Sequence, residues 1–144
     1  MRFIQLTDPH FVPQGELLFE LDPRARLAAA VRAINASHAD CEFVIITGDL
    51  THRGEHEAYE SLAQVLLALE RPPILLVGNH DRRAPFRQVF DDADCDENGF
   101  VQAMHSFSDA TVVTLDTLDE GETDGFMCPQ RLEFLAACLA DAPA

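Results

Sequence analysis

Lysine is absent from this chain of 144 residues, and its ten basic residues, all arginine, stand against 25 acidic ones, which gives a formal net charge of −15. Nucleic-acid backbones and anionic membrane surfaces are bound mainly through lysine and arginine. No apolar run approaches the roughly 18 residues that a membrane span needs. We therefore expect a protein that binds neither nucleic acid nor membranes. Whether it forms a homo-oligomer stays open.

Cysteine is scarce and shows no ligand pattern. The four cysteines (Cys41, Cys95, Cys128 and Cys138) include no C-x-x-C pair, and their spacing suits neither a structural zinc site nor a small disulfide scaffold. The N-terminal apolar stretch is too short for a secretory signal. We expect free thiols in a reducing cytoplasm. The length corresponds to about one domain, which can bury a core without disulfides.

Three short apolar runs dominate the first half of the chain, at residues 3–6, 43–47 and 74–77. Each is nearly continuous, which is typical of strands buried on both faces of a parallel sheet. Helical periodicity separates them: one helix begins at Asp22-Pro23, with Asp22 as N-cap, and a second covers residues 55–69. The sequence therefore predicts two consecutive right-handed βαβ units.

The second half predicts smaller elements. A short helix is expected at residues 85–90, followed by an acidic loop. Two strands, 100–107 and 111–115, are expected to form a hairpin through Ser108-Asp109, and residues 129–139 form an amphipathic helix. A further strand would be expected to follow in this alternation, and none does.

Polar clusters follow all three predicted parallel strands. Because parallel strands end at one edge of a sheet, their side chains should meet there. Together they offer carboxylates, imidazoles and a carboxamide without a thiolate, a donor set that suits Mn, Fe, Co, Zn or Ni. Each motif alone is commonly an ordinary turn, but three at successive strand ends favour a metal site. The clusters are Thr7-Asp8-Pro9-His10, Thr47-Gly48-Asp49 and Gly78-Asn79-His80-Asp81.

The spacing suggests separate roles. Asp8 and His10 lie two residues apart, so in an extended segment their side chains leave on the same side and can share one ion. Asp49 follows a glycine and has two oxygens, which can bridge two ions. Asn79 offers an amide oxygen, and its neighbour His80 is left to face a substrate. Asp81 is expected to orient the His80 imidazole.

The motifs D-x-H, G-D and G-N-H-D, in this order, resemble the calcineurin-like metallophosphoesterase superfamily. Further segments resemble the bacterial class III cyclic-nucleotide phosphodiesterases and their glycerophosphodiesterase relatives: Gly48-Asp49-Leu50-Thr51, Glu57-Ala58-Tyr59, Leu115-Asp116-Thr117 and Gln130-Arg131-Leu132. The resemblance implies an α/β fold, a β-sandwich flanked by helices in four αββα layers. Residues 1–144 would be the N-terminal portion of that domain, with βαβαβ units, a hairpin and a helix.

The resemblance also implies a reaction and residue roles. Two divalent metal ions (Mn, Fe, Co or Zn) would be held by Asp8 and His10, by a bridging Asp49 and by Asn79. His80 would contact the phosphate or protonate the leaving alkoxide. The activity implied is hydrolysis of a small phosphodiester, a cyclic nucleotide or glycerophosphodiester, by in-line attack of water or hydroxide on phosphorus.

The chain departs from the family in one respect. The family completes its site with later histidines, including a G-H-x-H turn, and the other histidines here match none of those positions. These are His38, His52, His56 and His105. We therefore expect the N-terminal part of a longer enzyme. A non-catalytic interaction module with this fold and a phosphomonoesterase of the same superfamily are the alternatives.

Three features near the clusters have two interpretations each. His52 either lines the pocket or lies in an exposed loop. Arg82 and Arg83 either touch substrate phosphate or pair with the nearby acids Asp91 and Asp92. The apolar loop at residues 11–21 either packs beside the leaving-group pocket or contacts a partner subunit.

Overall fold

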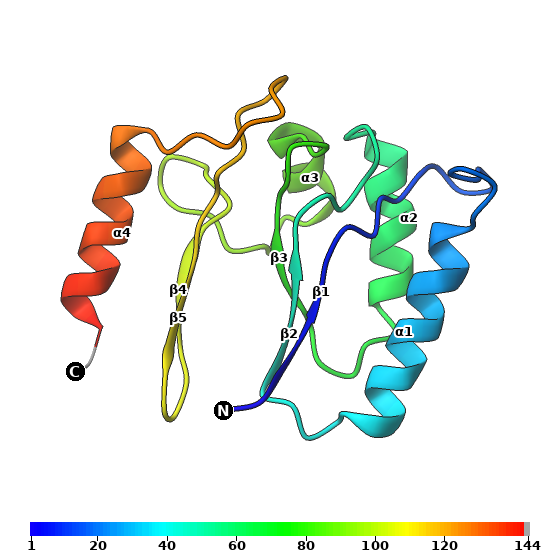
Figure 1. Ribbon diagram of the computed structural model, residues 1–144, viewed down its shortest axis with the longest axis horizontal. Helices are drawn as coiled ribbons and strands as arrows, with labels where there is room; N and C mark the ends of the chain where they lie inside the picture. Colours follow the sequence, from blue (N-terminus) through cyan, green and yellow to red (C-terminus); the bar gives the residue numbers. More distant parts are fainter. Residues whose placement is uncertain (143–144) are drawn as a thin grey trace.

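A parallel sheet forms the centre of the computed structural model, which describes residues 1–142 (Figure 1). The strands β1 (Phe3–Leu6), β2 (Phe43–Thr47) and β3 (Ile74–Leu76) pair in the order β1-β2-β3. They are joined by α1 (Pro23–Ser37) and α2 (His56–Leu66). The two predicted βαβ units are thus confirmed, and all three strands end at the same edge of the sheet, at the top of Figure 1.

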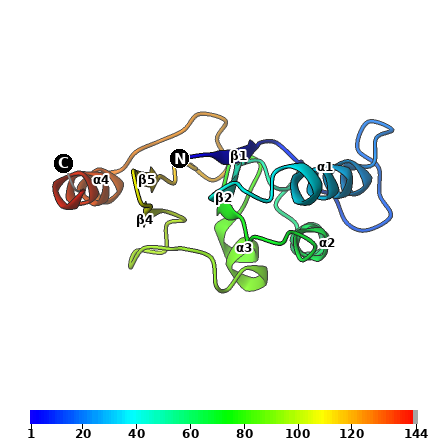
Figure 2. The ribbon, with the colours of Figure 1, turned by 90° about the horizontal axis from the view of Figure 1, so that it is seen from below.

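A hairpin and two helices complete the described structure. The strands β4 (Ala103–Ser106) and β5 (Thr111–Thr114) form the predicted antiparallel hairpin. The helix α3 (Arg83–Val89) follows β3, and α4 (Pro129–Asp141) closes the chain. Figures 1 and 2 both show the order α4, hairpin, parallel sheet, and the pair α1 and α2. This order confirms the α/β class and agrees with the four layers that the resemblance implies.

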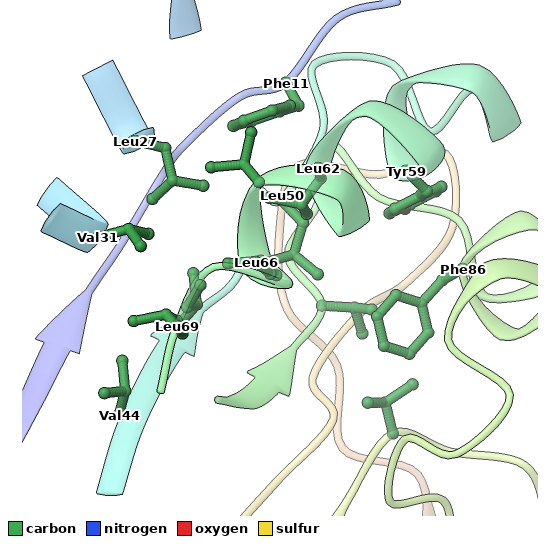
Figure 3. Close-up of a cluster of buried hydrophobic side chains, with 14 of the residues drawn as sticks. Phe11, Leu27, Val31, Val44, Leu50, Tyr59, Leu62, Leu66, Leu69 and Phe86 are labelled. Atoms are coloured by element: carbon green, nitrogen blue, oxygen red, sulfur yellow. The ribbon is translucent and has the colours of Figure 1, made fainter. Parts of the chain in front are cut away.

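The main core lies between the parallel sheet and helices α1 and α2 (Figure 3). Helix α1 contributes a stripe at helical spacing that includes Leu27, Val31 and Ile34, as its periodicity predicts. The start of α1 is also as predicted, because the side chain of Asp22 accepts a hydrogen bond from the Ala25 amide at 3.1 Å. Other buried members are Val44, Leu50, Tyr59, Leu62, Leu66, Leu69 and Phe86.

Two predictions about strands were wrong in detail. Strand β1 is not buried on both faces: it lies at an edge of the sheet, and Phe3 is 44 % exposed. Strand β4 begins at residue 103 rather than 100. The amides of Phe100 and Val101 donate instead to carboxylates, those of Asp96 and Asp116, both at 2.9 Å, so they are not available to a strand ladder.

Within residues 1–142, no helix has the length and apolar character that crossing a membrane requires. The four cysteines are free.

Candidate metal centre

The segments that follow β1 and β2 continue side by side beyond the strands. The amide of Asp8 donates to the carbonyl of Gly48 at 3.3 Å, and the amide of His10 donates to the carbonyl of Asp49 at 2.9 Å. One residue further along, the amide of Phe11 donates to the carbonyl of Leu50 at 2.9 Å. This extended pairing brings the D-x-H and G-D motifs together at the edge of the sheet.

Three of the predicted ligands have an unusual backbone conformation. Asp8, His10 and Asp49 have φ values of 54°, 43° and 48°, in the left-handed region that few residues other than glycine adopt. The backbone hydrogen bonds between the two segments hold them there. Strain of this kind persists only where surrounding structure enforces it, and it concentrates at functional sites.

The side chains of these residues converge. The Nε2 atom of His10 lies 3.7 Å from Oδ1 of Asp8 and 3.7 Å from Oδ2 of Asp49. One donor atom from each of the three residues lies within 4.8 Å of the other two. The buried Nδ1 of His10 has no hydrogen-bond partner among residues 1–142. Two carboxylates and an imidazole this close fit a divalent cation, because a cation relieves the repulsion between the carboxylates.

Asn79 lies on the wall of a cavity that it shares with Asp8 and Asp49. The cavity has a volume of about 320 Å³, and its wall also includes Asp119 and Asp124 from the loop before α4. Its described wall contains four carboxylates and no arginine, which attracts cations. Sequence reasoning did not assign Asp119 and Asp124 to the site, and the acidic composition of their loop was the only signal.

Two glycines allow the loop after β2 and the loop after β3 to touch. A Cβ atom on Gly78 would lie 2.3 Å from Oδ1 of Asp49 and 2.4 Å from its amide nitrogen. A Cβ atom on Gly48 would lie 3.1 Å from the Cα of Gly78. The His80 amide donates to Oδ1 of Asp49 at 3.1 Å. The position of the Asp49 carboxylate is therefore set by backbone contacts that only glycine at 78 permits.

The His80 imidazole is oriented by a backbone carbonyl. Its Nδ1 lies 2.7 Å from the carbonyl oxygen of His52, and because a carbonyl only accepts, Nδ1 carries the proton. The His80 ring stacks on the ring of His52, with centroids 5.3 Å apart, and its centroid is 4.7 Å from that of His10. Burial lowers the pKa of His52, and the nearby His80 and His10 lower it further. The structure thus places His52 within this cluster of rings.

The predicted role of Asp81 was wrong. Asp81 is 2 % exposed, and its carboxylate binds the loops around it instead of the His80 ring. Burial raises its pKa, against the lowering effect of the backbone hydrogen bonds. Five groups donate to the Asp81 carboxylate at 2.9 to 3.1 Å: the amides of Gly78, Leu50 and Thr51 and the hydroxyls of Thr51 and Tyr59. Asp81 therefore ties the end of β3 to the end of β2.

The two arginines after the G-N-H-D motif have different surroundings. Arg83 binds neither Asp91 nor Asp92: its Nε and Nη2 donate to the two oxygens of the fully buried Asp116, at 2.8 and 2.7 Å. Burial alone would lower the pKa of Arg83, but the bond and charge of Asp116 outweigh it and raise the pKa. The side chain of Arg82 packs over Gly54, outside the described wall of the metal cavity.

Arg131 joins the buried Asp116 cluster from α4. Its Nη1 donates to the Asp116 carbonyl at 2.9 Å and to the Leu118 carbonyl at 3.0 Å. Through these contacts Asp116 connects α3, the hairpin and α4 behind the metal cavity. Sequence reasoning included Asp116 and Arg131 in motifs without assigning them this role.

Fold and site together define a class: an α/β protein with oxygen and imidazole donors for a divalent metal at the carboxyl edge of a parallel sheet. The model for calcineurin-like phosphoesterases matches residues 1–130, so the chain belongs to this family. Proteins of this family use divalent metals, in agreement with the donor cluster.

Curated relatives match the chain over nearly its whole length. A probable cyclic nucleotide phosphodiesterase of Rhodopseudomonas palustris is 51 % identical to this chain, in an alignment that covers 100 % of this chain and 53 % of the relative. A glycerophosphodiester phosphodiesterase GpdQ of Enterobacter lignolyticus is 29 % identical, over 99 % of this chain and 52 % of its own. The 3′,5′-cyclic adenosine monophosphate phosphodiesterase CpdA of Escherichia coli is 28 % identical, over 99 % and 51 %. The chain thus spans about half the length of these relatives.

Proposed function

We propose that this chain is the N-terminal portion of a metal-dependent phosphodiesterase that hydrolyses a small phosphodiester by in-line attack of water or hydroxide on phosphorus. The convergence of donor atoms from Asp8, His10 and Asp49 within 4.8 Å carries the proposal. The names of the relatives support a diester of the cyclic-nucleotide or glycerophosphodiester class. Since the chain spans about half of these relatives, further metal ligands would come from other residues of the whole protein.

Two divalent ions of the Mn, Fe, Co or Zn type would occupy this centre. Asp8 and His10 would hold the first, Asn79 would hold the second, and Asp49 would lie between them. The shared cavity of Asp8, Asp49 and Asn79 supports this assignment. When bound, such ions neutralise charge on the phosphoryl oxygens and lower the pKa of an attacking water.

The charge of the site supports the need for metal. An anionic diester is repelled by a chain of net charge −15 and by a cavity whose described wall has four carboxylates. Bound divalent ions invert this local field. The same charge balance favours a small anion over a nucleic acid, and the four free cysteines favour a reducing cytoplasm.

His80 is the candidate for proton transfer. Because its Nδ1–H is held by the His52 carbonyl, its Nε2 is the atom available to the substrate. In the imidazolium form, Nε2 would donate a proton to the leaving alkoxide. In the neutral form it would accept a hydrogen bond. Its backbone amide at the same time holds Oδ1 of Asp49, so one residue links the metal ligand and the reacting group.

The test uses the purified protein at its natural length, supplied with Mn²⁺. We expect hydrolysis of bis-p-nitrophenyl phosphate in preference to the monoester p-nitrophenyl phosphate. Asp49→Ala should lower kcat/KM by at least about a thousandfold, since loss of a shared ligand removes several kcal/mol of transition-state stabilisation. Asp91→Ala, in the acidic loop after α3, is the matched control and should leave activity unchanged.

Metal content distinguishes the alternatives. Two ions per chain in the wild type, and fewer in Asp49→Ala, would agree with the proposal. A protein without divalent metal, or an Asp49→Ala variant with full turnover, would overturn the site and leave the non-catalytic interaction module as the better hypothesis. Preference for the monoester would favour a phosphomonoesterase.

A further inference from the structure

A second groove shares Asp8 with the acidic cavity but is otherwise lined by different residues. Its volume is about 420 Å³, and Asp8 and His10 form part of its wall. The rest of the wall comes from the end of β1 and the segment after it, from the loop that precedes α1 and from the first turns of α1. This loop and these turns stand at the same end of the molecule as the strand ends (Figure 1). In contrast to the acidic cavity, this wall is mostly apolar: Leu6, Leu18, Phe19, Leu21, Leu27 and Ala30.

Phe19 occupies an unusual position in this wall. It is 82 % exposed, and both it and Glu20 have positive φ values, 50° and 64°. Leu18 and Leu21 exchange two backbone hydrogen bonds of 2.9 Å around them, the arrangement of a type I′ turn. Such turns favour glycine, asparagine and aspartate at the two central positions, so a bulky exposed phenylalanine there is costly in both conformation and hydration.

Rings connect Phe19 to the candidate metal centre. The Phe19 ring meets the His52 ring edge to face at a centroid distance of 6.1 Å. His52 stacks on His80, and both His52 and His80 lie close to the ring of His10. An aromatic surface thus runs from a metal ligand to the outer wall of the groove.

We propose that this groove is the subsite for a planar organic group of the substrate, a nucleobase in a cyclic nucleotide, with Phe19 as a specificity-determining residue that stacks on it. This inference rests on the proposed function. A diester whose phosphorus lies at Asp8 and His10 must direct an organic substituent away from the metals, and the groove begins at these two residues.

The chemistry of the wall favours a ring over a glycerol head group. Apolar side chains leave hydroxyl and ammonium groups without hydrogen-bond partners, which is costly, whereas a base stacks on an aromatic ring. Arg26 stands on the α1 side of the groove. As the one guanidinium of the described groove wall, it stands where the face or edge of a base would lie.

The experiment compares two substrates that share the same reacting atoms, adenosine 3′,5′-cyclic phosphate and methyl ribofuranoside 3′,5′-cyclic phosphate, which lacks the base. In the Mn²⁺-loaded protein at natural length, we expect Phe19→Ala to lower kcat/KM for the first about tenfold and for the second less than about twofold. Phe19→Tyr keeps the ring and should retain the wild-type ratio. Leu17→Ala is the matched control, because Leu17 is exposed on the same loop but lines a different cavity.

Three outcomes would overturn the inference: equal losses for both substrates, no loss for either, or a wild type that does not favour the substrate with a base. If bis-p-nitrophenyl phosphate is still hydrolysed in a manner that depends on Asp49, only the subsite assignment falls. If no diester is hydrolysed, the proposed function falls as well. Because Phe19 is exposed, its loss should leave folding intact, which circular dichroism checks.

Discussion

Replacing Gly78 by alanine tests the tight packing between the loop after β2 and the loop after β3. The added Cβ would lie 2.3 Å from Oδ1 of Asp49, whereas ordinary contact begins at 3.4 Å. The carboxylate or the loop must therefore move by about 1 Å to restore ordinary contact. The φ angle of Gly78 lies outside the left-handed region, so alanine would otherwise stabilise the chain by about 0.4–1 kcal/mol. The clash works against that gain.

The expected net effect follows from these two opposing terms. Overpacking costs about 1–3 kcal/mol. After the gain from alanine, we expect a net loss of up to about 2.6 kcal/mol in the free energy of unfolding, measured by urea denaturation of the metal-free protein. A movement of this size exceeds the roughly 0.5 Å tolerance of a metal site, so Mn²⁺ affinity, measured by calorimetry, should fall at least about tenfold.

Gly125→Ala is the matched control. Gly125 borders the same cavity, but its added Cβ would make only ordinary contacts, at 3.4 to 3.5 Å with Thr117. We expect its free energy of unfolding to rise by about 0.4–1 kcal/mol, the gain that alanine brings without a clash, and its Mn²⁺ affinity to stay close to that of the wild type. If Gly78→Ala matches the control in both measurements, the contact with Asp49 does not set the carboxylate position, and the reasoning about this centre is refuted.

Two further substitutions test the buried polar contacts behind the site. Tyr59→Phe keeps the ring but removes the hydroxyl that donates to Asp81 at 2.9 Å and accepts from the Arg82 amide at 3.0 Å. Urea denaturation should therefore show a loss of about 1–3 kcal/mol in the free energy of unfolding. A loss under about 0.5 kcal/mol would contradict this role of the hydroxyl. Asp116→Asn breaks a buried ion pair with Arg83 and should lower the free energy of unfolding by about 3 kcal/mol. Glu120→Gln, at the exposed end of the same cluster, is the control and should lower it by less than about 1 kcal/mol. Equal losses would argue against a stabilising role of the buried pair.

Local pattern predicted much of the fold. Continuous apolar residues predicted β2, and the Asp22-Pro23 pair predicted the first residue of α1. These predictions held because strand burial and helix capping depend on residues close together in the chain. β1 has the same apolar character, yet it is half exposed, because its place at the edge of the sheet depends on what covers it.

The candidate ligands could also be located from the sequence. Parallel strands deliver their following residues to one edge whatever the details of packing, so Asp8, His10 and Asp49 had to approach one another. Their left-handed backbone conformations could not be read in advance, because they are held by hydrogen bonds between loops about 40 residues apart. The near contact of Gly78 with Asp49 likewise depends on the packing of two separate loops.

The sequence by itself determined the α/β class, the strand-end ligand motifs and the strongly acidic charge balance of a chain without lysine. Only the tertiary structure decided the partners of buried polar groups: Asp81 holds two loops together instead of orienting His80, and Arg83 binds Asp116 instead of Asp91, which is nearer in the sequence. The physical reason is that a buried charge must be satisfied by whatever donors the packed loops bring to it, and sequence distance does not reveal which donors those are.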